Sequence, residues 1–180
     1  MIIKQQLTLS CLAAALMLGA CQSAPPLPLA PVAQVDLKRF MGDWYVIASI
    51  PTWIEKGAHN AIESYRLDAD GSIAVSFTFR EGAFDGKPKQ YSPRGFVGDH
   101  PSQAIWGMQF IWPFKTDYRI TYLADDYSQT IVSREARDYV WIMARTPGIA
   151  DADYQRLLKI VGAQGYDLSR IQKVPQRWPQ

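Results

Sequence analysis

Short runs of alternating apolar and polar residues, separated by turn-forming residues, fill the chain between residues 45 and 145. The run at 72–79 is the clearest, because Ile73, Val75 and Phe77 alternate with small or polar residues, as in a strand with one buried face. The pattern predicts eight strands, at residues 45–49, 62–67, 72–79, 90–97, 104–111, 117–123, 129–133 and 139–145.

The connections between these runs are mostly short and polar. Residues 68–71, Asp-Ala-Asp-Gly, predict a tight turn in which the glycine has a positive φ. Short strands joined in this way favour an antiparallel meander, and a sheet of this size tends to close because closure removes its unpaired edges. We therefore expect an all-β fold with one flanking helix, namely an eight-stranded antiparallel up-and-down β-barrel. Such a barrel either fills its interior with side chains or holds one small ligand.

A helical period appears after the last strand. Residues 151–164 carry Tyr154, Leu157, Leu158 and Val161 on one face, and Gly165 is a natural stop. This apolar stripe predicts a C-terminal helix packed on the outside of the barrel, over the last strand, which is apolar on both faces. A short helical turn is expected at 35–40, where it plugs one end, and a short strand at 171–174 beside the first strand.

The turns predict that the two ends of the barrel differ. In an up-and-down barrel successive turns alternate between ends, and those at 68–71, 99–103 and 124–128 are short and polar. The turns at the opposite end carry Trp53, Ile54, Phe84, Trp112 and Phe114. We therefore expect one closed polar end and one open end with an apolar rim, where exposed aromatic groups need a reason. The alternative is that these aromatic side chains fold back as lids on the core.

The first 20 residues have the pattern of a lipoprotein signal peptide. Lys4 precedes an uncharged apolar stretch at 7–18, which is shorter than the roughly 20 residues that cross a bilayer. Leu-Gly-Ala-Cys at 18–21 resembles the bacterial lipobox, and this resemblance implies that Cys21 is acylated and becomes the first mature residue. An ordinary secretory signal with an incidental cysteine is the alternative. Four prolines within residues 21–33 predict an extended tether, which leaves the domain at 34–180.

Composition and charge exclude several classes of function. Removal of Lys4 with the signal leaves 18 Lys and Arg against 17 Asp and Glu, or 18 − 17 = +1, without a basic stripe, so no nucleic-acid partner is expected. Cys11 is removed and Cys21 is consumed by the lipid, so neither a disulfide nor a thiolate site is expected. His59 and His100 fall in loops at opposite ends, and we predict no metal and no cofactor. No catalytic motif is present, and the protein is not expected to be an enzyme.

Three segments together resemble the signature regions of lipocalins. They are Phe-Met-Gly-Asp-Trp-Tyr at 40–45, Tyr-Leu-Ala-Asp-Asp-Tyr at 122–127 and Trp-Ile-Met-Ala-Arg-Thr-Pro at 141–147. The resemblance spans residues 33–177 and is closest to the bacterial outer-membrane lipocalins, although the Thr-Asp-Tyr form found in many animal lipocalins occurs here slightly early, at 116–118. It implies that Gly42, Trp44 and Arg145 are structural, with the guanidinium of Arg145 over the indole of Trp44.

Counting inward positions by strand parity gives a lining rich in aromatic side chains and methionine. Such a lining suits an acyl chain, because burial contributes about 25 cal/mol per Å² of apolar surface while a few polar groups fix the head. Arg94 either meets a carboxylate or phosphate inside, or faces outward into solvent. The candidate ligand-binding residues are Val46, Ala48, Trp53, Val75, Phe77, Phe79, Trp106, Met108, Phe110, Tyr118, Ile120, Tyr122, Trp141 and Met143.

The resemblance implies a lipid-anchored lipocalin of the cell outer membrane that faces the periplasm. It would bind a fatty acid or lysophospholipid for storage, transport or membrane upkeep under stress, with a homodimer as an open possibility. One alternative is an enzyme on the same scaffold, for which Glu63 and several tyrosines offer no convincing catalytic pair. Another is a filled barrel that acts as a protein-interaction module of the envelope. Haem is a weaker ligand alternative, because no histidine falls on an inward strand position.

Overall fold

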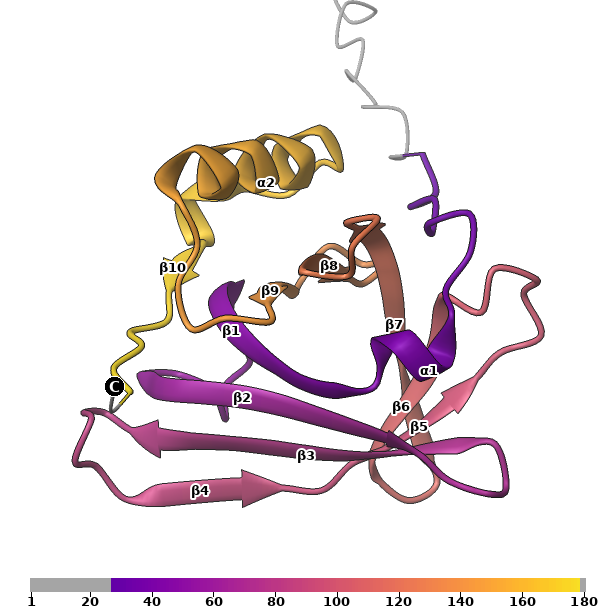
Figure 1. The fold of residues 1–180 in the computed structure, drawn as a ribbon, viewed down its shortest axis with the longest axis horizontal. Coiled ribbons are helices and arrows are strands. Elements are labelled where there is room, and N and C mark those ends of the chain that lie inside the picture. Colours follow the sequence, from indigo (N-terminus) through magenta and orange to yellow (C-terminus); the bar gives the residue numbers. More distant parts are fainter. Residues whose placement is uncertain (1–26, 179–180) are drawn as a thin grey trace, which may run out of the picture.

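The computed structural model describes residues 27–178, which form one closed antiparallel barrel with a helix on its outside (Figure 1). The predicted signal peptide, Cys21 and half of the predicted tether lie outside the described residues. Within residues 27–178, no helix has the length and apolar character to cross a membrane. The strands are β1 (Gly42–Ile50), β2 (Ala58–Leu67), β3 (Ser72–Glu81), β4 (Pro88–Tyr91), β5 (Arg94–Val97), β6 (Ile105–Ile111), β7 (Phe114–Leu123), β8 (Gln129–Ser133), β9 (Val140–Ala144) and β10 (Gln172–Lys173).

The strand order confirms the eight-stranded barrel. Neighbouring strands pair antiparallel in the order β1-β2-β3-β5-β6-β7-β8-β9, and β1 also pairs with β9, which closes the sheet. One predicted strand, at 90–97, is wrong as a single element. It is interrupted at residues 92–93 into β4 and β5, which both pair with β3, because Pro93 has no N–H to donate to the ladder.

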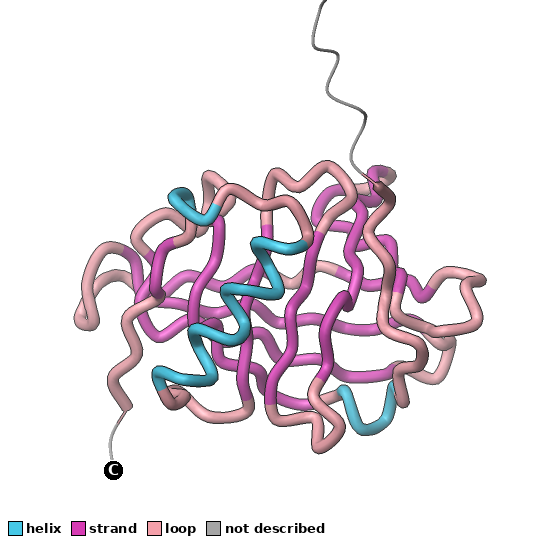
Figure 2. The backbone as a smooth tube through the Cα atoms, turned by 90° about the horizontal axis from the view of Figure 1, so that it is seen from above, coloured by secondary structure: helices cyan, strands magenta, loops and turns pink. Residues whose placement is uncertain are grey.

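The helix α2 (Asp151–Ala163) covers the outer face of the barrel as predicted. Leu157 and Val161 are fully buried, in an outer apolar cluster that also holds Ile131 and Ile142 of the barrel wall. Figure 2 shows the helix lying obliquely across the strands. After a 3-10 turn at Leu168–Arg170, the predicted short strand is present as β10, which pairs with β1.

Two β-bulges correct the predicted inward positions of Ala48 and Tyr122. The β1–β9 register shifts between Val46 and Ala48, and the β7–β8 register shifts between Ile120 and Tyr122. Each extra residue turns the following side chains to the opposite face. Ala48 therefore packs in the outer cluster under α2, and the hydroxyl of Tyr122 accepts a hydrogen bond from Arg156 of that helix.

The end of the barrel predicted to be closed is plugged by aromatic side chains. The short helix α1 (Leu37–Phe40) begins at Asp36, whose carboxylate accepts from the N–H groups of Lys38 and Arg39. It places Phe40 in the core, with ring centroids 5.0 Å from Trp44 and 5.5 Å from Trp106. This half of the barrel is therefore filled.

Arg145 joins the start of the barrel to its last strand. Its guanidinium lies 3.8 Å from the ring centroid of Trp44 and donates to the carbonyl oxygens of residues 39, 40, 41 and 43, at 2.8–3.0 Å. Gly42 has a φ of +93°, and a Cβ there would lie 3.4 Å from Nη1 of Arg145. Gly42 thus allows the chain to turn closely around the guanidinium.

We expect Arg145→Met to lower the free energy of unfolding by about 3 kcal/mol, because it takes a donor from four carbonyl oxygens and removes the cation–π contact. Of the four, the carbonyl of Phe40 keeps the indole N–H of Trp44 as a donor. Urea unfolding measures this value. Arg66→Met is the matched control, since the Arg66 side chain is 75% exposed and makes only a surface ion pair with Asp68. Equal losses for the two variants would contradict a special role for Arg145.

Candidate ligand-binding cavity

The half of the barrel away from α1 is hollow. A cavity of about 430 Å³ lies between the strands and opens among the turns after β1, β6 and β8. Most of its lining is apolar, with polar groups contributed by a few side chains. It is lined by Thr52, Trp53, Ile54, Glu55, Glu63, Val75, Phe77, Tyr91, Pro93, Met108, Phe110, Ile111, Thr116, Asp117, Tyr118, Arg134, Tyr139 and Trp141.

The structure divides the candidate ligand-binding residues into three groups. Half of them line the cavity: Trp53, Val75, Phe77, Met108, Phe110, Tyr118 and Trp141. Five are buried in the core of the barrel without lining the cavity: Val46, Phe79, Trp106, Ile120 and Met143. Ala48 and Tyr122 lie outside. The barrel is thus neither wholly filled nor wholly hollow.

Exposed apolar side chains surround the opening of the cavity. We call Trp53, Phe110, Ile111, Trp112 and Phe114 the rim, and Trp53 and Trp112 are each 81% exposed. Because these two indoles stand in solvent, they are not folded back as lids. Phe84, the remaining aromatic side chain predicted at this end, packs edge-on against His59 and lies under the guanidinium of Arg177.

A carboxyl group and two phenols meet inside the barrel. Tyr65 donates to a carboxylate oxygen of Glu63, and the hydroxyls of Tyr65 and Tyr118 lie 2.8 Å apart. Part of the Glu63 surface is accessible, but it opens into the cavity and not into bulk water. Desolvation by burial therefore raises the pKa of Glu63 to about 7, and the nearby Glu55 adds to the rise. Burial likewise raises the pKa of Tyr65 and of Tyr118 well above the usual value.

No sequence motif identifies this trio. Glu63 and Tyr65 are two residues apart on β2 and therefore share a face, but Tyr118 is 53 residues further along the chain on β7. Strand parity could have placed Glu63 and Tyr65 together on the inner face. Their approach to Tyr118 depends on the curvature of the closed barrel.

A second carboxyl group, that of Glu55, connects the β1–β2 loop to the cavity wall at the mouth. Glu55 is buried and accepts from the N–H of Thr52 at 3.1 Å and from the indole N–H of Trp141 at 3.2 Å. Desolvation raises the pKa of Glu55, whereas these hydrogen bonds oppose the rise. Glu55 therefore holds the β1–β2 loop against the cavity wall.

Among the described residues, Arg134 is the one cationic side chain in the lining of the cavity. Arg134 pairs with Asp138 at 3.2 Å, and its Nε atom is buried without a hydrogen-bond partner among the described residues. Arg134 lines the apolar cavity, and a guanidinium can donate hydrogen bonds to an anionic group of a ligand. Arg94, in contrast, is an outward side chain that pairs with Asp68 and Asp70, so the outward interpretation of this residue is confirmed.

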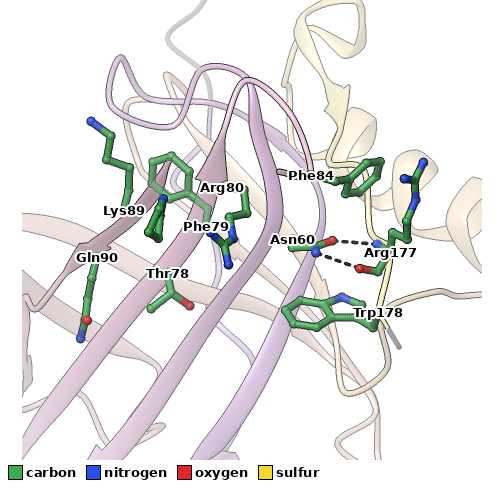
Figure 3. A pocket seen from close by; sticks show the side chains of 10 residues that line it. Asn60, Thr78, Phe79, Arg80, Phe84, Lys89, Gln90, Arg177 and Trp178 are labelled. Atoms are coloured by element: carbon green, nitrogen blue, oxygen red, sulfur yellow. Dashed lines mark hydrogen bonds between the residues drawn. The ribbon is translucent and has the colours of Figure 1, made fainter. Parts of the chain in front are cut away.

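A larger but open groove lies on the outside of the barrel. It has a volume of about 620 Å³ and runs between β3, β4 and the C-terminal segment. Asn60 fixes that segment through paired hydrogen bonds with the backbone of Arg177, and Trp178 stands beside it (Figure 3). Exposed side chains such as Arg80 and Gln90 form much of this groove. The barrel cavity is the better site for an apolar ligand, because it is enclosed by apolar side chains.

In residues 27–178, no three side chains of His, Cys, Asp or Glu gather as metal ligands. His59 contacts the carbonyl of Gly57 at 2.9 Å, and His100 contacts Ser102 at 2.7 Å. Both histidines are therefore engaged locally.

Comparison with known proteins identifies the class. A family model described as a lipocalin-like domain matches residues 35–176, and the chain belongs to the lipocalin family. Insecticyanin from the tobacco hornworm Manduca sexta has the same fold, with a TM-score of 0.65 and 16% identity, over 86% of this chain and 87% of that one.

Bacterial lipoproteins are among the similar sequences. Outer membrane lipoprotein Blc of Citrobacter freundii is 33% identical, over 91% of this chain and 92% of the relative. Blc of Escherichia coli K12 is 31% identical over the same shares. Temperature-induced lipocalin-1 of Arabidopsis thaliana is 30% identical, over 81% of each chain. The predicted relation to bacterial outer-membrane lipocalins is thus confirmed.

The raised pKa of Glu63 makes stability depend on pH. The folded state holds the proton more tightly than the unfolded chain does, at a pKa of about 7 against 4.5, so stability present below pH 4.5 is lost as the pH rises through about 7. Glu63→Gln keeps an acceptor for Tyr65 and removes this loss. We expect the variant to gain about 3 kcal/mol relative to the wild type between pH 4.5 and pH 8.

Urea unfolding at both pH values measures this gain. Glu81→Gln, on the exposed end of β3, is the control for the removal of a carboxylate. A constant difference between wild type and Glu63→Gln across this pH range would show that Glu63 titrates normally.

Proposed function

We propose that this protein is a lipid-anchored lipocalin that binds a fatty acid or a lysophospholipid in its barrel cavity. The observation that carries the proposal is the cavity of about 430 Å³, enclosed by apolar side chains and open through the rim. The mechanism is capture by apolar burial, and no bond is made or broken. Storage, transport or maintenance of membrane lipids are the functions that such capture supports.

The free energy gained by burying an acyl chain is large enough for it to be the ligand. Each buried methylene contributes about 0.8 kcal/mol, so ten methylenes contribute about 8 kcal/mol. Association and the ordering of the chain oppose this by about 4 kcal/mol or more. The contacts of the head group therefore decide whether the dissociation constant reaches the micromolar range.

Arg134 is the side chain that we assign to the ligand head. Its cationic side chain lines the cavity near the mouth, where the head of a tail-first ligand would stay. A carboxylate and a phosphate can both pair with a guanidinium. The deep end of the cavity is less favourable for an acyl chain, because the polar side chains of Glu63 and Tyr118 border it. At neutral pH and below, the proton on Glu63 reduces the penalty of covering this carboxyl group with methylenes.

The anchor is proposed from the sequence and from the relatives. Cys21 follows the lipobox-like residues, and relatives at 31% and 33% identity are outer membrane lipoproteins by name. Two or more acyl chains on Cys21 would hold the protein stably, whereas a single chain would not. The proposed location is the outer membrane, with the domain on the periplasmic side.

One observation favours an enzyme as the second candidate. Glu63, with its raised pKa, and the hydroxyls of Tyr65 and Tyr118 converge inside the barrel, as an acid–base site would require. The three groups, however, satisfy one another. Tyr65 donates to Glu63 and also contacts Tyr118, so the trio is explained as a buried hydrogen-bond network.

We expect Trp141→Ala to weaken binding of lysophospholipid by about tenfold, because its indole is part of the cavity wall. Native mass spectrometry of the purified protein, titrated with lysophospholipid and with fatty acid, gives the affinity. Trp178→Ala is the matched control, as Trp178 lines the outer groove. Loss of binding in Trp178→Ala alone would place the ligand in that groove, and no binding by the wild type at micromolar concentrations would refute the carrier function.

The two candidate functions differ in the fate of the ligand. We expect lysophospholipid to be recovered intact after prolonged incubation with the protein, because no group in the trio is free to attack an ester. Mass spectrometry of the extracted lipid checks this. Hydrolysis that is abolished in Glu63→Gln but retained in Glu81→Gln would establish the enzyme instead.

A further inference from the structure

We infer that the mouth of the cavity faces the membrane that carries the lipid anchor, and that the rim docks on the surface of this bilayer. The inference rests on the proposed acylation of Cys21. It adds an orientation and an interaction surface to the proposed function, and it gives a lipid a direct path between bilayer and cavity.

The first described residues lie at the mouth of the barrel. The carbonyl of Leu27 accepts a hydrogen bond from Arg137, and the N–H of Leu29 donates to Glu135 at 3.2 Å. Both partners belong to the β8–β9 turn, residues 134–139, which also contributes Arg134 and Tyr139 to the cavity wall.

From the mouth, the segment runs along β7 toward the closed end. Val32 donates to the carbonyl of Ile120 at 2.9 Å, and Val35 donates to that of Ser102 at 2.8 Å. Figure 1 shows this indigo segment descending to α1. The described chain therefore enters the domain beside the open end, even though α1 plugs the closed one.

The covalent length of the chain restricts the orientation. Cys21 and Leu27 are 27 − 21 = 6 residues apart, and six residues span at most about 20 Å. A ten-residue strand such as β2, tilted as barrel strands are, separates the two ends by about 25 Å. An acylated Cys21 thus keeps the mouth close to the bilayer, and the closed end cannot rest on the same surface.

The rim has the composition of a membrane-contacting surface. Ile111 and Phe114 are each 73% exposed, beside Trp112 at the tip of the β6–β7 turn. Exposed Lys56 lies in the β1–β2 loop, which also holds Trp53 of the rim. Tryptophan and lysine together are typical of segments that lie in the interface of a bilayer, where the indole enters the headgroup region and the ammonium meets anionic headgroups.

The closed end has the opposite character. Its turns at 68–71, 99–103 and 124–128 hold five aspartates and neither lysine nor arginine. Of these five, Asp68 pairs with Arg66 and Arg94, and Asp70 pairs with Arg94. Lys38 and Arg39 of α1 are exposed at the same end. None of the large apolar side chains exposed in residues 27–178 lies in these turns. Within the described residues, the turns of the closed end thus offer no large apolar side chain to a bilayer, which favours the same orientation as the tether.

Two matched alanines test the orientation. Ala136, in the β8–β9 turn, and Ala69, in the β2–β3 turn, are both exposed. Lipidation consumes the thiol of Cys21 and processing removes Cys11, so a cysteine introduced at either position is the only thiol. The lipidated variants Ala136→Cys and Ala69→Cys are labelled with a nitroxide and reconstituted into vesicles of phosphatidylethanolamine and phosphatidylglycerol.

Electron paramagnetic resonance then measures the accessibility of each label to oxygen and to a water-soluble nickel chelate. We expect the ratio of oxygen to nickel accessibility to be about threefold higher at position 136, because a docked rim enters the headgroup region. Adding Trp53→Ser and Trp112→Ser should return position 136 to the value of position 69. Both indoles are exposed, so thermal unfolding should confirm an intact fold.

Three outcomes overturn the orientation on a lipidated protein. They are equal aqueous accessibility at both positions, lipid contact at position 69, and spin–spin broadening at position 136 without lipid contact, which would show that the rim pairs two copies of the chain. An intact mass without acyl chains on Cys21 overturns the proposed anchor and the orientation together. Native mass spectrometry measures ligand binding separately from these four outcomes. A failure of the orientation can therefore be told apart from a failure of the proposed carrier function.

Discussion

Closure of the sheet onto its first strand is the constraint on which the remaining structure depends. Eight antiparallel strands leave two free edges unless β1 meets β9, and both the meeting point and the chain that leads into β1 are fixed by Arg145. The guanidinium satisfies carbonyl groups that a tight turn would otherwise leave without donors, and the indole of Trp44 covers its face. One side chain therefore connects the plug at the closed end with the seam of the barrel.

The interior of the barrel is filled near α1 and hollow at the opposite, open end. Phe40, Trp44 and Trp106 occupy the full width of the closed half, so the strands cannot approach one another there. In the open half a cavity remains between the inward side chains, several of which are aromatic. The barrel is thus filled at one end and hollow at the other. The protein holds its shape at one end and can accept a ligand at the other.

Local patterns were enough to predict the number of strands, the turns, the outer helix and the difference between the two ends. Period-two alternation and turn residues act over only a few positions, so they can be recognised in the sequence. Ala48 and Tyr122 were misplaced because a bulge shifts parity by one residue without a sequence signal of its own. The strand at 90–97 broke at Pro93, which did carry such a signal. The trio of Glu63, Tyr65 and Tyr118 was missed because its contact joins strands that are distant along the chain. For the candidate site, strand parity predicted much of the apolar cavity wall. It did not predict the carboxyl groups of Glu55 and Glu63 in that wall.

The path of residues 27–35 along β7 also determines how the domain responds to mechanical force. A pull on the chain from the N-terminal side acts along this segment, because residues 27–35 run from the mouth toward the closed end. The contacts of Leu27 and Leu29 and the bond from Val32 to Ile120 are therefore loaded together, in shear. Tension is thus passed to β7 and to the β8–β9 turn before it reaches α1 and the plugged end of the barrel.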